Sequence, residues 1–243
     1  MSDRFSRDPV RSSGSYQGMS RSSAGVQAFM SQVYGWMASG LFLTAVVSYY
    51  VSSSMTILRL LYSMPFGFMG LFGVQLLLVV FLSARVCKMS SGLATGLFLV
   101  YSALTGITLS PIFIVYTHSS IASIFAITAG MFGAVSISGY TTKKDLTAWG
   151  SRLFMLLFGL IIATLVNVFW LQNSGMELLL SYAGVLIFVG LTIYDTNRLR
   201  RLGEELEGNE EAIRRYAVTG ALSLYLDFIN MFLYLLRIFG NRR

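Results

Sequence analysis

Seven long apolar stretches follow one another along the chain and are separated by short polar connections. Each is close to the ~20 residues that an α-helix needs to cross ~30 Å of hydrocarbon. The stretches are Phe29–Val51, Phe66–Ala84, Leu93–Tyr116, Ile121–Tyr140, Leu153–Trp170, Leu178–Asp195 and Tyr216–Phe239. Pro111 interrupts the third stretch, where we expect a kink. The pattern predicts an all-α integral membrane protein with seven transmembrane helices.

The composition supports a membrane protein and excludes several other classes. Of the 243 residues, 55% are hydrophobic and only 12% are charged, whereas an ordinary soluble domain is about 25% charged. The net charge of +7 fits the basic cytoplasmic loops of a membrane protein better than a surface for nucleic acid. Cys87 is the only cysteine and His118 the only histidine, so neither an intrachain disulfide nor a Cys/His metal cluster can form. We expect no cofactor and no nucleic-acid partner.

Residues 1–23 differ in composition from the rest of the chain. They are rich in Ser, Arg and Gly and contain almost no aliphatic residues, so they cannot bury enough apolar surface to become ordered. They also lack the apolar core of a cleavable signal peptide. We expect residues 1–23 to form a disordered cytoplasmic tail and residues 24–243 to form a single seven-helix membrane domain.

The distribution of lysine and arginine predicts the orientation of the helices. Basic residues gather in the tail and in the second, fourth and sixth connections, whereas the first connection has only Arg59 and the third and fifth have none. Because cytoplasmic loops are enriched in Lys and Arg, we expect a cytoplasmic N-terminus. A full seventh crossing would place Arg242 and Arg243 outside, against this rule, and a re-entrant hairpin would keep them inside. We favour the full crossing.

A few charged residues lie within the apolar stretches or at their ends, and three of them are candidates for function. Arg85 follows the second stretch, Asp195 ends the sixth, and Asp227 lies inside the seventh. A carboxylate within the membrane is costly and usually faces a partner in the bundle interior, so Asp227 is a candidate functional residue. If Asp195 and Asp227 meet in a low-dielectric site, they cannot both ionise cheaply and will share a proton. An arginine beside them would favour their ionised form.

The residues leave other interpretations of the two acids open. Asp227 lies about three turns into the last helix, deeper than Asp195 should be. The two acids meet only if the sixth helix continues past Asp195 or the seventh starts late. Asp195 can instead pair with Arg198 on its own helix, at a spacing of three residues. Asp227 can instead be satisfied by Asn230 or by a tyrosine such as Tyr225.

Four motifs make this sequence resemble a known family. They are Gly106–Pro111 (GITLSP), Gly139–Leu146 (GYTTKKDL), Tyr194–Thr196 (YDT) and Leu222–Asn230 (LSLYLDFIN). From about Gln27 to Gly240 the chain resembles the transmembrane Bax inhibitor motif family, in its bacterial branch. The last of the four motifs is highly specific for that family.

The resemblance implies a fold and a function. The last of seven helices is expected at the centre of two three-helix layers, in a bacterial inner membrane. The family forms a calcium-permeable leak pathway governed by pH, in which two aspartates act as the sensor. Asp195 and Asp227 take these positions, and they are also candidate contacts for Ca²⁺. An arginine at the end of the second helix latches onto them, a role that falls to Arg85, with Lys88 as a nearby competitor. From its position alone, Arg85 can also extend to the lipid headgroups.

Two other functions compete with a calcium channel. Some bacterial members associate with a membrane-bound ATP-dependent protease, so a non-conducting regulator that binds such a partner is the main alternative. An intramembrane aspartyl protease would also use two membrane aspartates. However, Asp227 follows Tyr225 and Leu226 rather than Gly-x-Gly, and no Pro-Ala-Leu stretch comes after it. We therefore expect a protein that is not an enzyme, with the lipid bilayer and Ca²⁺ as its partners.

Overall fold

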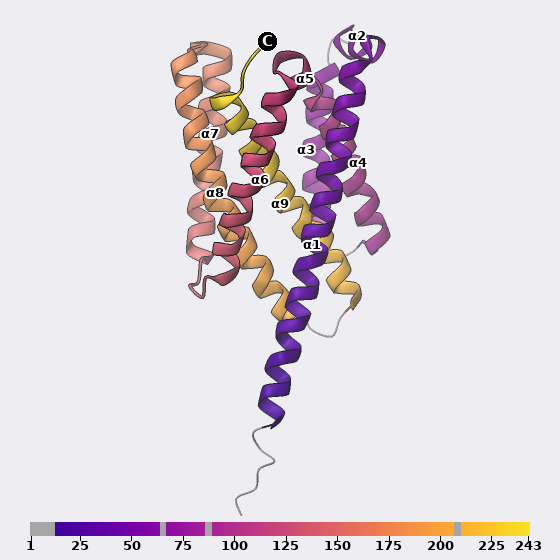
Figure 1. Cartoon of the computed structure of the whole chain (residues 1–243), viewed down its shortest axis with the longest axis vertical. Coiled ribbons are helices and arrows are strands. Elements are labelled where there is room, and N and C mark those ends of the chain that lie inside the picture. The colour runs from indigo at the N-terminus through magenta and orange to yellow at the C-terminus, as the bar shows by residue number, and fades with distance from the viewer. Residues whose placement is uncertain (1–12, 64–66, 86–88, 207–209) are drawn as a thin grey trace, which may run out of the picture.

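The computed structural model describes residues 13–63, 67–85, 89–206 and 210–243, which are mostly helical. The helices are α1 (Ser13–Ser53), α2 (Met55–Ser63), α3 (Gly67–Arg85), α4 (Ser91–Leu109), α5 (Ile112–Val115), α6 (His118–Thr141), α7 (Thr147–Val166), α8 (Ser174–Glu205) and α9 (Glu210–Phe239). A π-helical turn, Asn167–Leu171, continues α7. Figure 1 shows the long helices side by side in an elongated bundle.

Six helical segments in the described part of the chain are long and apolar enough to cross a membrane. They are α1 from Ala24 onward, α4 with α5, α6, α7 with its π-helical turn, α8 and α9. The second expected crossing corresponds to α3, which is apolar but shorter. The protein is an all-helical integral membrane protein, as predicted. The exact count of seven crossings stays a prediction.

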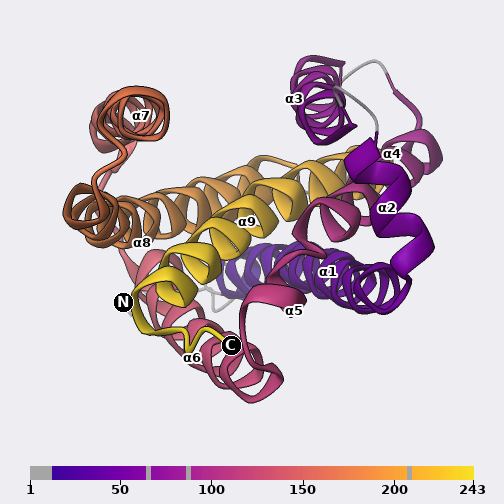
Figure 2. The ribbon, with the colours of Figure 1, turned by 90° about the horizontal axis from the view of Figure 1, so that it is seen from above.

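The last helix, α9, lies at the centre of the bundle. It packs against α1, α4, α6 and α8, which surround it in Figure 2. In its most apolar segment 56% of the residues are buried, against 11% in α7. By contrast, α7 packs along α8 and α3 packs along α4, so both stand at the flank of the bundle in Figure 2. The arrangement of the other helices as two layers of three stays a prediction.

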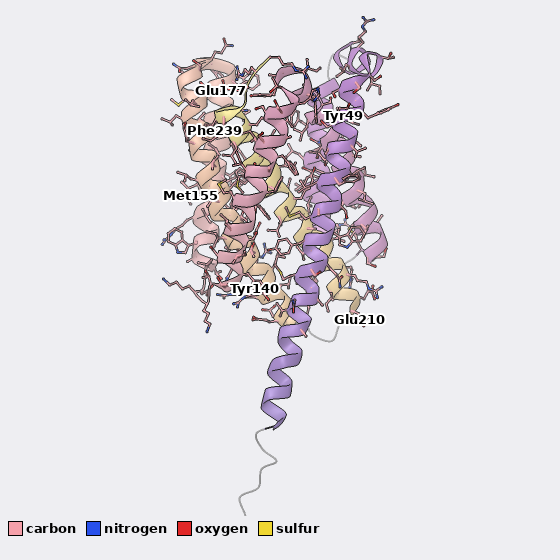
Figure 3. The ribbon with its side chains drawn as sticks, in the orientation of Figure 1. Tyr49, Tyr140, Met155, Glu177, Glu210 and Phe239 are labelled. Carbon is pink, nitrogen blue, oxygen red and sulfur yellow. The ribbon has the colours of Figure 1, made fainter. Side chains whose placement is uncertain are left out.

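The last helix runs from one end of the bundle to the other. It begins at Glu210 near the lower end and reaches Phe239 near the upper end (Figure 3). The backbone N–H of Thr117 donates to the carbonyl oxygen of Asn241 at 3.1 Å, and the N–H of Asn241 donates to the hydroxyl of Ser120 at 2.9 Å. The chain after α9 is thereby tied to the start of α6. A continuous helix along the bundle favours a full crossing over a re-entrant hairpin, and the crossing itself stays a prediction.

The first helix begins earlier than the composition predicts. α1 starts at Ser13, within the expected tail, and residues 1–12 lie outside the described residues, so the division into a disordered tail and a membrane domain stays a prediction. No proline occurs between Ser13 and Ser53. Once the apolar part of α1 is helical, each further residue adds a hydrogen bond without a new nucleation step.

The kink expected in the third apolar stretch is confirmed. α4 ends at Leu109, and α5 begins at Ile112, directly after Pro111. The side-chain hydroxyl of Ser110 donates to the carbonyl oxygen of Ile107 at 2.8 Å. A local serine therefore satisfies a carbonyl group at the break, as helices within membranes require.

Candidate site around two buried aspartates

The turn between α6 and α7 is fastened to α8. The side-chain amide of Asn197 donates to the carbonyl oxygens of Gly139 and Thr142, at 3.2 and 2.8 Å. The two helices approach closely here, because a Cβ atom at Gly139 would lie 2.6 Å from the carbonyl oxygen of Ile193. The glycine and the asparagine therefore fix α8 against α6 only two residues away from Asp195.

Asp145 holds the same turn in place. Its carboxylate accepts hydrogen bonds from the backbone N–H and the hydroxyl of Thr147, at 2.9 and 2.6 Å. It also pairs with Arg201 of α8 at 3.2 Å, and this guanidinium donates to the carbonyl oxygen of Lys144 at 2.8 Å. The hydrogen bonds from Thr147, with the charge of Arg201, hold the pKa of Asp145 below its ordinary value. The carboxylate is therefore ionised at neutral pH and keeps the turn joined to α8.

Asp195 lies beside a polar cavity at the lower end of the bundle. Only 8% of Asp195 is exposed, and α8 continues for ten residues beyond it, to Glu205. The cavity has a volume of about 530 Å³ and is bounded by α3, the start of α7, α8 and α9. Ser83 lines it from α3, and Ser223 lines it from α9. Asp195 is thus buried where four helices meet.

Asp227 is buried in the middle of the central helix. It is 4% exposed, and its Oδ2 atom has no hydrogen-bond partner within the described residues. Neither of the expected supporting side chains bonds to it. The amide of Asn230 donates to the carbonyl oxygen of Leu226 at 2.8 Å, and the hydroxyl of Tyr225 lies 2.6 Å from that of Thr44. Buried polar atoms are almost always hydrogen-bonded, so this carboxylate oxygen is unusual, as are the hydroxyl oxygens of Ser48, Ser136 and Thr196 in the described part of the chain.

Asp195 and Asp227 act on each other electrostatically. The charge of Asp195 is felt at Asp227, and the helices that carry them pack together. The continuation of α8 past Asp195 is one of the two conditions under which the sequence lets the acids meet. Two interacting buried carboxylates can share a proton, and their oxygens suit Ca²⁺. In the described ranges, no group of three or more His, Cys, Asp or Glu side chains gathers to hold a metal ion.

The basic residues lie at the edge of this site. Arg198 is exposed, and its charge acts on Asp195. Arg85 is exposed in the last turn of α3, two residues after Ser83 on the cavity wall. Among the ion pairs of the described residues, none joins Arg85 to either aspartate. Lys88 lies outside the described residues. Asp195 therefore lines the cavity, Asp227 lies one helical turn beyond the lining residue Ser223, and Arg85 lies two residues after Ser83 on the cavity wall.

Aromatic side chains surround α9 on both sides of the buried aspartate. The ring of Phe228 packs against Phe125 and Phe132, with centroids 5.2 and 5.5 Å apart. The ring of Tyr225 packs edge-on against Phe98 at 5.8 Å. Aromatic rings therefore pack against α9 on both sides of Asp227.

Two polar contacts that the sequence analysis missed also join helices. Glu177 in the first turn of α8 pairs with Arg237 in the last turn of α9 at 3.3 Å, near the upper end of the bundle (Figure 3). The side chain of Gln75 in α3 donates to the hydroxyl of Thr108 in α4 at 3.1 Å. A signal for each was present in the sequence, since Gln75 and Arg237 are polar residues within apolar stretches. Their partners lie far away along the chain.

These features define a class of membrane protein. It has an all-helical bundle, a central helix with a buried acid, and a second acid on the neighbouring helix beside a polar cavity. Residues 26–243 match the model of the family described as Inhibitor of apoptosis-promoting Bax1. The chain belongs to this family of Bax inhibitor-like membrane proteins, which confirms the resemblance found in its motifs.

Relatives occur in distant bacteria. The inner membrane protein YbhL of Escherichia coli (strain K12) is 54% identical over 221 residues, which cover 90% of this chain and 94% of YbhL. An uncharacterized protein of Borreliella burgdorferi is 48% identical over 215 residues, covering 88% of this chain and 92% of the relative. An uncharacterized membrane protein of Streptococcus pyogenes serotype M1 is 34% identical over 223 residues, which cover 91% of this chain and 96% of the relative. The similarity thus extends over nearly the whole length of each relative.

Proposed function

We propose that this protein is a pH-sensitive calcium leak channel gated by Asp195 and Asp227. The observation that carries the proposal is the burial of two interacting carboxylates on α8 and on the central helix α9. Ionisable groups inside a membrane protein mark ion pathways and proton-sensing sites. Carboxylate oxygens are suitable ligands for Ca²⁺, and carboxylate side chains favour cations in channels.

The polar cavity supports an ion path from the lower end of the bundle. It reaches Asp195 on α8 and Ser223 on α9, which is one helical turn before Asp227. Beyond this point the ring of Phe228 packs against those of Phe125 and Phe132. In our proposal this is the packed core of a closed channel. Opening then requires α9 to shift against α8, so that ions pass the two carboxylates.

The position of Arg85 supports a latch at the same cavity. In our proposal the guanidinium stabilises the closed state by pairing with the ionised aspartates. α3 ends at Arg85, and two residues earlier Ser83 lines the cavity. An arginine side chain is long enough to swing from solvent into such a cavity. The described conformation then corresponds to a closed core with its latch disengaged.

We also propose a bacterial inner membrane as the location, with the lower end of the bundle in the cytoplasm. The relative YbhL of Escherichia coli is named an inner membrane protein, which supports the location. The basic residues at the lower end support the orientation, because Lys143 and Lys144 lie in the turn after α6 and Arg214 lies in the first turns of α9.

Calcium flux from liposomes that contain only the purified protein tests the proposal. We expect loaded calcium to leave these liposomes faster than protein-free liposomes, and faster at mildly acidic than at neutral pH. The double variant Asp195→Asn/Asp227→Asn is the matched control, which should lose this pH dependence. A flux equal to that of protein-free liposomes at every pH would refute the channel. It would favour a non-conducting regulator, whose partner could be a membrane-bound protease.

A further inference from the structure

A groove runs between α1 and α6 on the side of the bundle that faces the viewer in Figure 1. Its volume is about 670 Å³, and Phe228 of the central helix forms part of its floor. The α6 wall includes Ile137, which is 65% exposed. Because both wall helices are membrane spans, the groove opens toward the surrounding lipid.

The lining of the groove changes from polar to apolar along its length. Gln27 and Ser31 of α1 line the lower part together with Tyr140 of α6, which lies near the lower end of the bundle in Figure 3. Further up the walls are apolar, with Leu41 on α1 and Phe132 on α6. This gradient suits an amphipathic molecule whose polar part lies at the lower end and whose hydrocarbon part extends toward the middle of the membrane.

Ser136 supplies a hydroxyl group in the wall that is without a hydrogen-bond partner among the described residues. It is 5% exposed and lines the groove one helical turn from Tyr140. The nearby Ser138, by contrast, donates its hydroxyl to the carbonyl oxygen of Ala134 at 3.1 Å. Since a buried hydroxyl is rarely left unsatisfied, Ser136 points to a ligand with a hydrogen-bond acceptor at that depth.

Two lysines lie just below this polar end. Lys143 and Lys144 follow the last turn of α6 and are exposed. In the described part of the chain they form no ion pair, whereas the neighbouring Arg201 is paired with Asp145. Lysines at the surface of a membrane attract anionic headgroups. The charge at this end therefore complements a phosphate.

We propose that the groove between α1 and α6 binds one phospholipid molecule from the leaflet at the lower end of the bundle. One acyl chain lies along Gly133 and Phe228. An ester carbonyl of the lipid accepts the hydroxyl hydrogen of Ser136, and the headgroup phosphate faces Lys143 and Lys144. Lipid binding at this site does not require ion conduction, so the lipid site and the proposed channel can be tested independently.

The size of the groove favours a lipid chain over a helix of another protein or of a second copy. An α-helix with its side chains is about 10 Å across and rises 5.4 Å per turn, so two turns occupy roughly 800 Å³. This volume already exceeds the 670 Å³ of the groove. An acyl chain is thinner and can follow the groove along its length.

Two glycines of α6 provide a matched pair of variants. A Cβ atom at Gly133 or at Gly130 would meet nothing within 4 Å, so leucine fits the backbone at both positions. Gly133 lines the groove, whereas Gly130 is exposed outside its lining. Gly133→Leu should therefore fill the groove, and Gly130→Leu should add only a side chain toward lipid. Melting of the helical circular dichroism signal checks that both variants fold.

Native mass spectrometry of the protein with added phosphatidylglycerol measures the binding. We expect one retained lipid per wild-type chain and the same binding in Gly130→Leu. Binding to Gly133→Leu should be about tenfold weaker, because a leucine side chain in the groove competes with the acyl chain for the same space. Equal binding by the two folded variants would overturn the proposal. The absence of bound lipid from the wild-type protein would also overturn the proposal. So would a wild-type dimer that Gly133→Leu disrupts.

Two further measurements use variants or probes that leave the groove intact. A phosphatidylglycerol with a photoreactive group in its acyl chain should cross-link to peptides that contain Leu41 or Gly133 in the wild-type protein. Labelling confined to α7, the most exposed span, would contradict the site. The variant Lys143→Gln/Lys144→Gln should keep the bound lipid but lose the preference for phosphatidylglycerol over phosphatidylethanolamine. A preference that survives would exclude these lysines as the headgroup contact.

Discussion

The side chain of Asn197 donates a hydrogen bond to the carbonyl oxygen of Thr142 at 2.8 Å, which joins α8 to the end of α6. The same amide donates to Gly139 at 3.2 Å. Asn197 is 2% exposed and lies two residues after Asp195. A single amide therefore satisfies two carbonyl groups at a helix end, where the backbone has no partner of its own.

Replacing this amide should destabilise the protein. Asn197→Ala leaves two carbonyl oxygens without their donor in a buried place, which costs about 1–3 kcal/mol. Thermal unfolding of the purified protein in detergent measures the loss. Asn230→Ala is the control. The Asn230 amide bonds only to the carbonyl of Leu226 on its own helix, so this substitution should reduce the stability less. Equal losses in the two variants would show that the bonds of Asn197 between helices are not special.

The membrane helices and the two acids are within reach of sequence reasoning because both follow local rules. An apolar run of ~20 residues has one stable arrangement in lipid, which is a helix that crosses it. A carboxylate within such a run has to face the protein interior. This reasoning leads to Asp227 without any knowledge of its neighbours, and the structure places Asp227 in the buried interior.

Contacts between distant segments are beyond such local rules. The depth of Asp195 depends on where α8 ends, and the charged residues after Asp195 favour a loop by composition. The helix nevertheless continues through them, helped by pairs such as Arg200 with Glu204 at 3.9 Å, four residues apart. The pairing of Glu177 with Arg237 likewise depends on how α8 and α9 pack, which neither stretch specifies alone.

The orientation of the bundle can be tested with single cysteines in a Cys87→Ser background. We expect a cysteine at Thr142, in the basic turn after α6, to resist an impermeant thiol reagent in intact cells. Cysteines at Ser119 and Asn241 should react from outside, because both lie at the opposite end of the bundle. Labelling at Thr142 without labelling at Ser119 would invert the proposed topology. Labelling at Thr142 and Asn241 together would contradict a full crossing by α9.

Loss of the proposed latch should raise the calcium leak. In the closed state Arg85 pairs with an ionised aspartate. Removing one partner of a buried pair destabilises the state that contains the pair by about 3–5 kcal/mol. Arg85→Ala should therefore raise the basal flux from liposomes at neutral pH. Lys88→Ala is the matched control from the same connection. A higher leak in Lys88→Ala alone would assign the latch to that lysine.

A further variant separates a latch on α3 from a local pair on α8. Arg198 acts electrostatically on Asp195 from its own helix. If Arg198→Ala raises the leak and Arg85→Ala does not, the aspartates are held by their own helix and α3 has no part in gating.

The response of the flux to pH should depend on both aspartates. In the proposed closed state an ionised carboxylate faces a guanidinium, and protonation removes that attraction. Acid therefore favours opening, and the flux should rise as the pH falls from about 8 to about 6, because two buried carboxylates that share a proton titrate nearer to neutral pH than a free aspartate. A tenfold change in proton concentration shifts the equilibrium by at most about 1.4 kcal/mol for each proton bound, so the rise should be graded. Asp195→Asn and Asp227→Asn imitate the protonated side chain and should each flatten the pH profile.

A second acid at the cavity provides the control for this experiment. Glu205 also lines the cavity, together with the basic residues Arg198 and Arg201. Glu205→Gln removes a titratable group from the wall of the same cavity and leaves both aspartates in place, so its pH profile should keep the slope of the wild type. The slope is a better measure than the absolute flux, because loss of a carboxylate can also slow the passage of Ca²⁺. If the slope survives in both aspartate variants and disappears in Glu205→Gln, proton sensing belongs to the cavity mouth and not to the buried pair.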